Sequence, residues 1–184
     1  SRFLLTVECA KIKPLIVLTK IDLVTKNDLL SYIDKFKSWG YDCIPVSIKC
    51  SQGIDSLIER FRKTKLTVLA GPSGVGKTSL INHLIPTISL PTSSVSKKLR
   101  RGTHTTRHVE LFEIGNGSLL ADTPGFNRPE IVCGPSEFAY LFPEFRSQLS
   151  KSTCKFRNCL HRDEPSCVIN KDLERYPFYR NNLE

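Results

Sequence analysis

A glycine-rich loop is the most specific chemical signal in the sequence. An apolar stretch precedes it and a helix-forming stretch follows it, which is the context that a phosphate-binding loop needs. Glycines let successive backbone N–H groups turn inward around a phosphate, and the N-terminus of the next helix adds partial positive charge. The loop therefore predicts a nucleoside triphosphate site, without saying which base is taken. Its residues are Gly71, Pro72, Ser73, Gly74, Val75, Gly76, Lys77, Thr78 and Ser79.

Two side chains of this loop have predicted roles of their own. Lys77 would reach the β- and γ-phosphates as a point charge. Thr78 would offer its hydroxyl to Mg²⁺. A chance glycine turn before a helix is the alternative, and the flanking strand and helix patterns argue against it.

A second motif, Thr19-Lys20-Ile21-Asp22, could recognise a base. It follows the apolar run 15–19, so it would lie in an exposed loop after a buried strand. The carboxylate of Asp22 can accept both the N1–H and the exocyclic amine of guanine, a pair that adenine does not offer. The aliphatic stem of Lys20 can lie along the ring. Taken alone, this tetrapeptide is also explained by a charged turn at the end of a strand.

The stretch Ser47-Ile48-Lys49 follows the next predicted strand. It resembles the element of GTPases whose backbone N–H groups contact guanine O6. Short polar loops after strands are common, so this stretch carries weight only together with the others.

Asp122 opens the sequence DTPG at the end of another predicted strand. There its carboxylate could hold Mg²⁺ through water, while the N–H of Gly125 could meet the γ-phosphate. A β-turn is the alternative reading of the same residues.

A Thr-rich stretch lies between the phosphate loop and DTPG. Thr105 or Thr106 could complete the Mg²⁺ shell and sense the γ-phosphate. Phe126 stands where many GTPases place a Gln that orients the attacking water, and an apolar ring cannot do this by hydrogen bonding. His104 is the nearest candidate for that role.

Three cysteines and a histidine lie close together near the C-terminus of the sequence: Cys154, Cys159, His161 and Cys167. Three thiolates and one imidazole suit a closed, tetrahedral, structural Zn²⁺ site. The alternative is three buried cysteines and a surface histidine. The surrounding sequence is polar and basic, so we expect the metal to stand in for an apolar core.

The apolar patterns predict the elements that must position these groups. Strands are expected at 15–19, 41–47 and 66–71, and helices at 25–39, 54–63, 77–85 and 136–142. A hairpin turning at 115–117 completes an α/β sheet with a small appendage. The expected domains are 1–142 for the nucleotide-binding part and 143–184 for the zinc-binding part.

The charge and the cysteine count add two predictions. The chain of 184 residues carries 27 basic and 18 acidic residues, a net charge of +9, which favours a polyanionic partner such as RNA. Two clusters at 97–107 and 146–162 contain five basic residues each and no acid. Seven cysteines make a disulfide framework improbable and favour a reducing compartment. No apolar run approaches the roughly 20 residues that span a bilayer, so we expect no membrane.

The motif order is reversed relative to most GTPases, since the base-reading elements precede the phosphate loop. This is the order of a circularly permuted GTPase, whose site still assembles because sheet geometry does not depend on where the chain is cut. The motifs TKID, SIK, GPSGVGKTS, GTHTT and DTPGF and the cysteine cluster together resemble the RsgA/YjeQ family. The resemblance implies a Ras-like phosphate-loop fold with a mostly parallel sheet, circularly permuted, and a small helical zinc-binding appendage.

The resemblance also implies a function. Members of this family are zinc-containing GTPases of late small-subunit maturation, stimulated by the small ribosomal subunit, so we expect GTP, GDP, Mg²⁺, structural Zn²⁺ and rRNA as ligands. In the family the histidine at the position of His104 is proposed to be catalytic. We expect a single chain in a bacterial cytoplasm, a plastid stroma or a mitochondrial matrix, with a lean to an organelle.

The sequence departs from the family pattern at several points. Thr19 replaces the Asn that usually contacts guanine N7 and the phosphate loop. No OB-fold is visible, and the strand expected between the strands at 15–19 and 66–71 has no counterpart. The chain has no Met even at position 1, which indicates a fragment or a processed form. Pro177 falls in the expected last helix as an interruption.

Three other functions stay open at this point. A GTPase of large-subunit assembly shares the motif order but lacks the cysteine cluster. A zinc-stabilised RNA-binding switch with little hydrolysis is compatible with Phe126. An ATP-dependent phosphotransferase is opposed by Asp22 and by the motif order.

Overall fold

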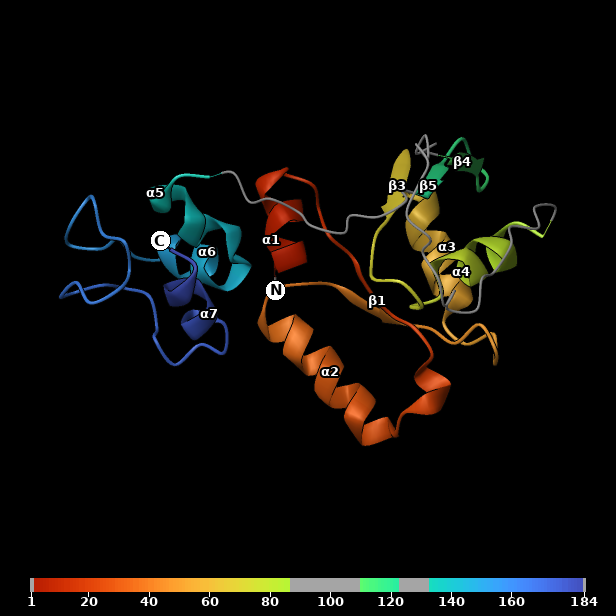
Figure 1. Cartoon of the computed structure of the whole chain (residues 1–184), viewed down its shortest axis with the longest axis horizontal. Helices are drawn as coiled ribbons and strands as arrows, with labels where there is room; N and C mark the ends of the chain where they lie inside the picture. Colours follow the sequence, from red (N-terminus) through yellow and green to blue (C-terminus); the bar gives the residue numbers. More distant parts are fainter. Residues whose placement is uncertain (1, 87–109, 123–132, 184) are drawn as a thin grey trace, which may run out of the picture. The chain divides into compact units, whose positions relative to one another are not determined.

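The computed structural model describes residues 2–86, 110–122 and 133–183 (Figure 1). The chain forms two compact units. The first unit comprises Ser1–Ile16, Leu30–Cys43 and Pro129–Glu184. The second comprises Val17–Leu29 and Ile44–Arg128. The expected domain division after residue 142 stays a prediction.

The second unit contains a three-stranded sheet in the order β3-β5-β4, formed by Leu66–Leu69, Leu119–Asp122 and Glu110–Glu113. Strand β5 runs parallel to β3 and antiparallel to β4. The predicted hairpin is confirmed, because the Ile114 N–H donates to the Ser118 carbonyl at 3.0 Å across the turn. The sheet therefore combines one parallel and one hairpin pairing.

Alternate residues of this sheet differ in burial, as the pleat requires. On one face Leu69, Phe112 and Leu120 are buried. In the same unit, α3 (Ile54–Arg62) and α4 (Lys77–Leu84) supply further buried apolar side chains, and both helices were predicted. The exposed apolar residues of the strands are Leu66, Val68, Leu111 and Leu119.

The strands β1 (Ile16–Leu18) and β2 (Cys43–Pro45) form a separate two-stranded sheet. The Ile16 N–H donates to Asp42 O at 2.9 Å, and the Val46 N–H donates to Leu18 O at 2.7 Å. The two strands therefore run in the same direction. Within residues 2–86, 110–122 and 133–183, no strand joins this sheet to the three-stranded one.

The helix predicted at 25–39 is α2 (Lys26–Ser38). It starts where expected, because the Asp28 N–H donates to the hydroxyl of Thr25 at 3.2 Å. Gly40, with φ +86°, follows it in the left-handed conformation that commonly ends helices. The first residues form α1 (Arg2–Cys9), and a 3-10 turn η1 (Ile21–Leu23) follows β1.

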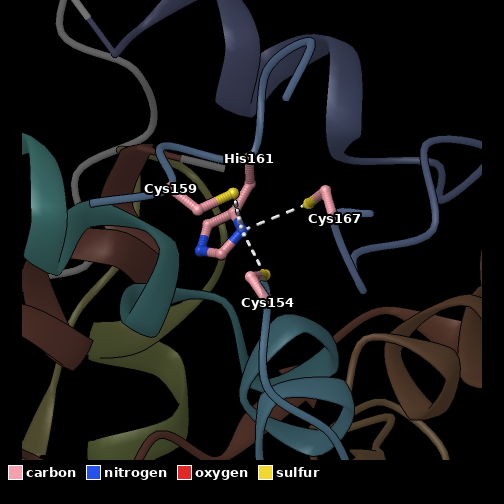
Figure 2. Close-up of side chains that lie close together, drawn as sticks. All are labelled: Cys154, Cys159, His161 and Cys167. Atoms are coloured by element: carbon pink, nitrogen blue, oxygen red, sulfur yellow. Dashed lines mark hydrogen bonds between the residues drawn. The ribbon is translucent and has the colours of Figure 1, made fainter. Parts of the chain in front are cut away.

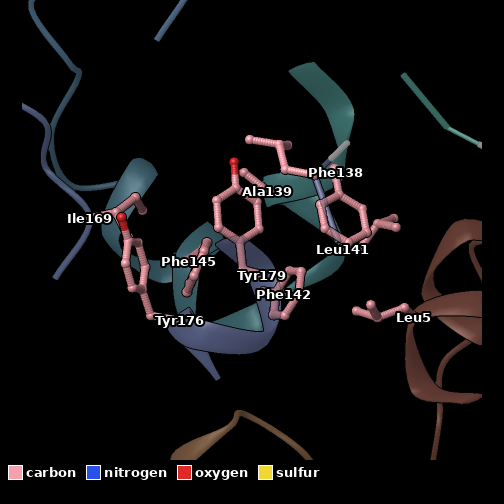
Figure 3. Packing of buried hydrophobic residues seen from close by; sticks show 10 residues of the cluster. Leu5, Phe138, Ala139, Leu141, Phe142, Phe145, Ile169, Tyr176 and Tyr179 are labelled. Carbon is pink, nitrogen blue, oxygen red and sulfur yellow. The ribbon is translucent and has the colours of Figure 1, made fainter. Parts of the chain in front are cut away.

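Aromatic side chains build the core of the first unit (Figure 3). They come from α5 (Pro135–Phe138), η2 (Ala139–Leu141), α6 (Pro143–Leu149) and α7 (Tyr176–Asn181), or from between them. The core packs Leu5 with Phe138, Ala139, Leu141, Phe142, Phe145, Ile169, Tyr176, Tyr179 and Leu183. The expectation that metal must replace a core in this region is therefore wrong.

The expected interruption at Pro177 is also wrong. Helix α7 begins at Tyr176, so Pro177 lies in its first turn. A proline there costs no hydrogen bond, because the first N–H groups of a helix have no partner within it.

A buried guanidinium joins two segments of the first unit. Arg175 is 2% exposed, and its Nε donates to Glu144 at 2.7 Å while a second nitrogen bonds the other carboxylate oxygen. Its guanidinium carbon lies 4.7 Å from the ring centroid of Trp39, and Tyr41 and Phe142 also flank it. Removal of one partner from such a buried pair typically costs about 3–5 kcal/mol, so α6, α7 and the end of α2 are held together here.

Two glycines of the second unit allow a test that separates steric fit from backbone strain. Gly53 has φ +72°, and a Cβ there would lie 2.1 Å from the Pro45 carbonyl oxygen. Gly117 has φ +69°, with nothing within 4 Å of such a Cβ. We expect Gly117→Ala to lower the free energy of unfolding by about 1–2 kcal/mol, and Gly53→Ala by a further ~1–3 kcal/mol from overpacking. Urea unfolding of both variants measures this, and equal losses would contradict it.

Candidate functional site

The phosphate loop lies between β3 and α4, as the sequence predicted. Three glycines give it its shape, with φ +155° at Gly71, +80° at Gly74 and +95° at Gly76. Nothing lies within 4 Å of a Cβ built on Gly74 or Gly76. At these two positions the requirement for glycine is conformational rather than steric.

Lys77 closes this loop on itself. Its ammonium donates to the carbonyls of Gly71 at 2.7 Å and Pro72 at 3.0 Å. The charge is therefore held at the loop, beside the backbone that would surround a phosphate. Its role toward a nucleotide stays a prediction.

Two hydrogen bonds tie the TKID loop to the phosphate loop within the second unit. The Thr19 hydroxyl donates to the Val75 carbonyl at 2.8 Å. The Lys20 ammonium donates to the Gly74 carbonyl at 2.8 Å. Residues more than fifty positions apart are thereby brought together, and the stem of Lys20 spans the space between the two loops. Although Thr19 replaces the usual Asn, its hydroxyl still makes the contact with the phosphate loop.

Asp22 and Ser47 are joined in the same unit. The Ser47 hydroxyl donates to Oδ1 of Asp22 at 2.6 Å and accepts from the Cys50 N–H at 3.2 Å. The Ile21 N–H donates to the Val46 carbonyl at 3.3 Å, so the TKID and SIK loops lie side by side. The hydrogen bond from Ser47 lowers the pKa of Asp22 below its usual value, which keeps the carboxylate ionised.

The sequence reasoning missed this role of Ser47. It assigned the SIK stretch to backbone recognition, along with Ile48 and Lys49, whereas the buried hydroxyl of Ser47 orients the carboxylate. No local pattern in the sequence indicates this contact, because Asp22 and Ser47 lie 25 positions apart and meet only in the folded unit.

Only some of the remaining residues predicted to bind the nucleotide lie in the part of the chain that the structure describes. Asp122 ends β5 in register with Leu69 of β3, at the edge of the sheet from which the phosphate loop leaves. The predicted residues His104, Thr105, Thr106 and Gly125 lie outside the described residues, as do Phe126 and the basic cluster at 97–107.

The cysteine cluster is assembled as the sequence predicted (Figure 2). Nδ1 of His161 lies 3.5 Å from the sulfurs of Cys154 and Cys159 and 3.3 Å from that of Cys167. All four ligand atoms lie within 4.8 Å of one another. Metal–sulfur bonds of about 2.3 Å and metal–nitrogen bonds of about 2.0 Å in a tetrahedron put these atoms roughly 3.5 Å apart. The four residues therefore fit one tetrahedral metal ion.

The protein holds the turn that carries His161 from both sides. The two carboxylate oxygens of Glu164 accept from the N–H groups of Leu160 and Arg162, each at 2.8 Å. The Tyr176 hydroxyl lies 2.9 Å from the carbonyl of His161 and 2.8 Å from that of Arg162. The Tyr179 hydroxyl donates to Leu160 O at 2.5 Å. Two tyrosines of the aromatic core in the first unit therefore also hold the turn that carries His161.

The surroundings alone favour neutral forms of the ligands. Burial raises the pKa of the Cys159 thiol to about 12 and lowers the pKa of the His161 imidazole. A divalent cation reverses this preference for the thiols, because it binds the thiolate and displaces the proton. Metal affinity should therefore fall as the pH falls.

An open cavity of about 470 Å³ in the first unit contains none of the predicted nucleotide or metal residues. Charged side chains line it, among them Lys11 and Lys13. Arg146, also in its lining, pairs with Glu8 at 2.8 Å. Arg146 belongs to the basic cluster at 146–162, and its charge is neutralised by this ion pair. Lys151, Lys155 and Arg157 of the same cluster are exposed.

A glycine-rich loop of the phosphate-loop pattern, tied by hydrogen bonds to a loop that carries an ionised acid, is the arrangement expected of a GTPase, and the same chain holds a cluster that fits a metal ion. A family model described as RsgA GTPase matches residues 1–132. The chain belongs to the RsgA GTPase family.

Curated relatives agree with this assignment. A protein of Prochlorococcus marinus strain NATL1A, named small ribosomal subunit biogenesis GTPase RsgA, is 88% identical over 184 residues, which cover 100% of this chain and 59% of the relative. A relative of the same name from Trichormus variabilis is 50% identical over 179 residues, covering 97% of this chain and 48% of the relative. The chain thus spans about half to three fifths of the length of these relatives.

A solved structure shows the same fold. The crystal structure of YjeQ from Thermotoga maritima superposes with a TM-score of 0.75 at 26% identity, over 99% of this chain and 63% of that one. The predicted family resemblance is confirmed, and a mixed α/β fold like that of YjeQ is established. The circular permutation stays a prediction.

Replacement of one cluster ligand should abolish metal binding. We expect Cys159→Ser to lose the single bound metal ion, whereas Cys50→Ser should keep it, because Cys50 is exposed and outside the cluster. Metal content after dialysis and the visible absorption of a Co²⁺ form measure the outcome. Full metal retention by Cys159→Ser would contradict the assignment.

The carboxylate of Glu164 should strengthen metal binding without touching the metal. We expect Glu164→Gln to weaken Co²⁺ binding by about 10–100-fold, as for other outer partners of metal ligands, because the amide NH₂ replaces one of the two oxygens that accept from Leu160 and Arg162. The neighbouring Asp163→Asn is the matched control, since that side chain is 69% exposed and its ion pairs are with the exposed Lys171 and Arg180. Equal Co²⁺ affinities of the two variants would refute the role.

Proposed function

We propose that this chain provides the GTP-hydrolysing part of a protein that acts in late maturation of the small ribosomal subunit. The name of its relatives supports the proposal. The observation that carries it is the pair of hydrogen bonds from Thr19 and Lys20 to the phosphate loop. They bring a guanine-reading carboxylate and a phosphate-binding backbone into one site.

Guanine is selected by Asp22, whose carboxylate accepts from N1–H and the exocyclic amine. The hydroxyl of Ser47 orients this carboxylate and lowers its pKa. Adenine lacks both donors and leaves a charged acceptor without partners, which disfavours ATP. In this proposal the backbone N–H groups of Ile48 and Lys49 contact guanine O6.

The phosphates are bound by the loop at 71–79. Lys77 exchanges its two carbonyl partners for phosphate oxygens, because a charged acceptor forms the stronger hydrogen bond. Thr78, Asp122 and one of Thr105 and Thr106 fit Mg²⁺ by their chemistry. When bound, Mg²⁺ neutralises the developing charge on the phosphates. His104 orients the attacking water, since Phe126 cannot.

The first unit contributes structure and RNA contact. Its cluster of Cys154, Cys159, His161 and Cys167 takes Zn²⁺, for which three thiolates and an imidazole are the usual ligands. Its exposed cations Lys151, Lys155 and Arg157 contact rRNA, together with the basic cluster at 97–107 of the second unit, so the binding is salt-dependent.

We propose further that the protein works as a single chain, in a compartment with ribosomes of the bacterial type. The relatives named above come from bacteria, and the lean to an organelle stays untested. In the part of the chain that the structure describes, none of the helices has the length and apolar character to cross a bilayer.

GTP turnover with and without purified ribosomal subunits tests the function. We expect small subunits to stimulate hydrolysis strongly and large subunits to leave it unchanged. His104→Ala should remove the stimulated rate by about 10²–10⁴-fold, the usual contribution of a positioned proton acceptor, while GDP binding stays intact. His83→Ala is a control histidine in α4.

Each other outcome favours a named alternative. Stimulation by large subunits alone would indicate a large-subunit assembly factor. GDP binding without turnover under any condition would indicate an RNA-binding switch. Competition by ADP as strong as that by GDP would remove the guanine assignment.

A further inference from the structure

The side chain of Thr19 has a limited supply of hydrogen bonds. A threonine hydroxyl carries one proton, so it can donate only one hydrogen bond at a time. That proton is used on the Val75 carbonyl at 2.8 Å, in a part-buried contact. What remains on the oxygen are acceptor lone pairs.

Guanine N7 is itself an acceptor without a proton. It therefore gains nothing from the lone pairs of the Thr19 oxygen. An asparagine at this position would have two N–H donors, one for the Val75 carbonyl and one for N7.

The hydroxyl has no reason to leave the carbonyl for the base. A switch from Val75 to N7 would exchange one neutral hydrogen bond for another of about the same 0.5–1.5 kcal/mol. It would also leave the part-buried Val75 carbonyl without its present donor, so the switch brings no net gain. The ammonium of Lys20 is also held away, at the Gly74 carbonyl.

We propose that Thr19 makes no hydrogen bond to N7 of the base, so that the polar recognition of guanine uses N1–H, the exocyclic amine and O6 alone. This rests on the proposed guanine specificity and defines its substrate class more closely. The pocket accepts guanine nucleotides whose N7 is replaced by carbon, and Thr19 acts on affinity only through the position of the phosphate loop.

The experiment compares the affinities of the full chain for GDP and 7-deaza-GDP, which carries C–H in place of N7. We expect the native protein to bind both within about twofold. Thr19→Asn, which keeps the contact with Val75 and adds a donor for N7, should bind GDP about 3–10-fold more tightly than 7-deaza-GDP, the value of one neutral hydrogen bond.

A second variant checks the part of Thr19 that acts on the loop. Thr19→Val has the same shape without the hydroxyl, so it should weaken binding of both nucleotides by the same factor. Circular dichroism and metal content establish that each variant is folded.

Two results would overturn the inference. The first is that the native protein prefers GDP over 7-deaza-GDP as strongly as Thr19→Asn does. The other is equal binding of the two nucleotides by Thr19→Asn, which would mean that this position does not face N7. ADP is included throughout, because tight ADP binding refutes the proposed guanine specificity itself, independently of the ratio between GDP and 7-deaza-GDP.

Discussion

A phosphate-binding loop that turns its N–H groups inward must turn its carbonyl groups outward, and the rest of the nucleotide site follows from this constraint. Donors from the protein bond four of these carbonyls. Lys77 bonds those of Gly71 and Pro72 from within the loop, and Thr19 and Lys20 bond those of Val75 and Gly74 from the TKID loop. The TKID loop is therefore positioned by its hydrogen bonds to the glycine-rich loop, whatever the order of the two motifs along the chain.

The cysteine cluster is supported in a different way, because hydrogen bonds from the protein itself hold the turn that carries its histidine. Glu164 holds the N–H groups and two tyrosines hold the carbonyls of the turn around His161. These tyrosines belong to an aromatic core with its own packing, such as the rings of Phe142 and Phe145 at 4.9 Å. The C-terminal part of the chain is thus more than a small domain folded by zinc.

Local patterns in the sequence predicted the elements well. The apolar runs, the Thr25 cap and the turn at 115–117 each specify a structure through nearest neighbours, so β1, α2 and the hairpin appear where expected. The four residues of the cluster were predicted because three cysteines and a histidine within fourteen positions are typical of a metal site. The aromatic core was not predicted, because Leu5 and Tyr179 meet only through tertiary folding. The hydroxyl of Ser47 was missed for the same reason, since Asp22 lies 25 positions away.

Trp39, the single tryptophan of the chain, lies where its indole reports on one unit alone. Its N–H donates to Glu174 at 2.9 Å, and the guanidinium of Arg175 stacks on its ring. A carboxylate and a cation in direct contact make indole emission sensitive to any displacement of these neighbours. The fluorescence of the native protein is therefore an intrinsic probe of the unit that contains the cysteine cluster, and a change of emission indicates a displacement of the groups around Trp39.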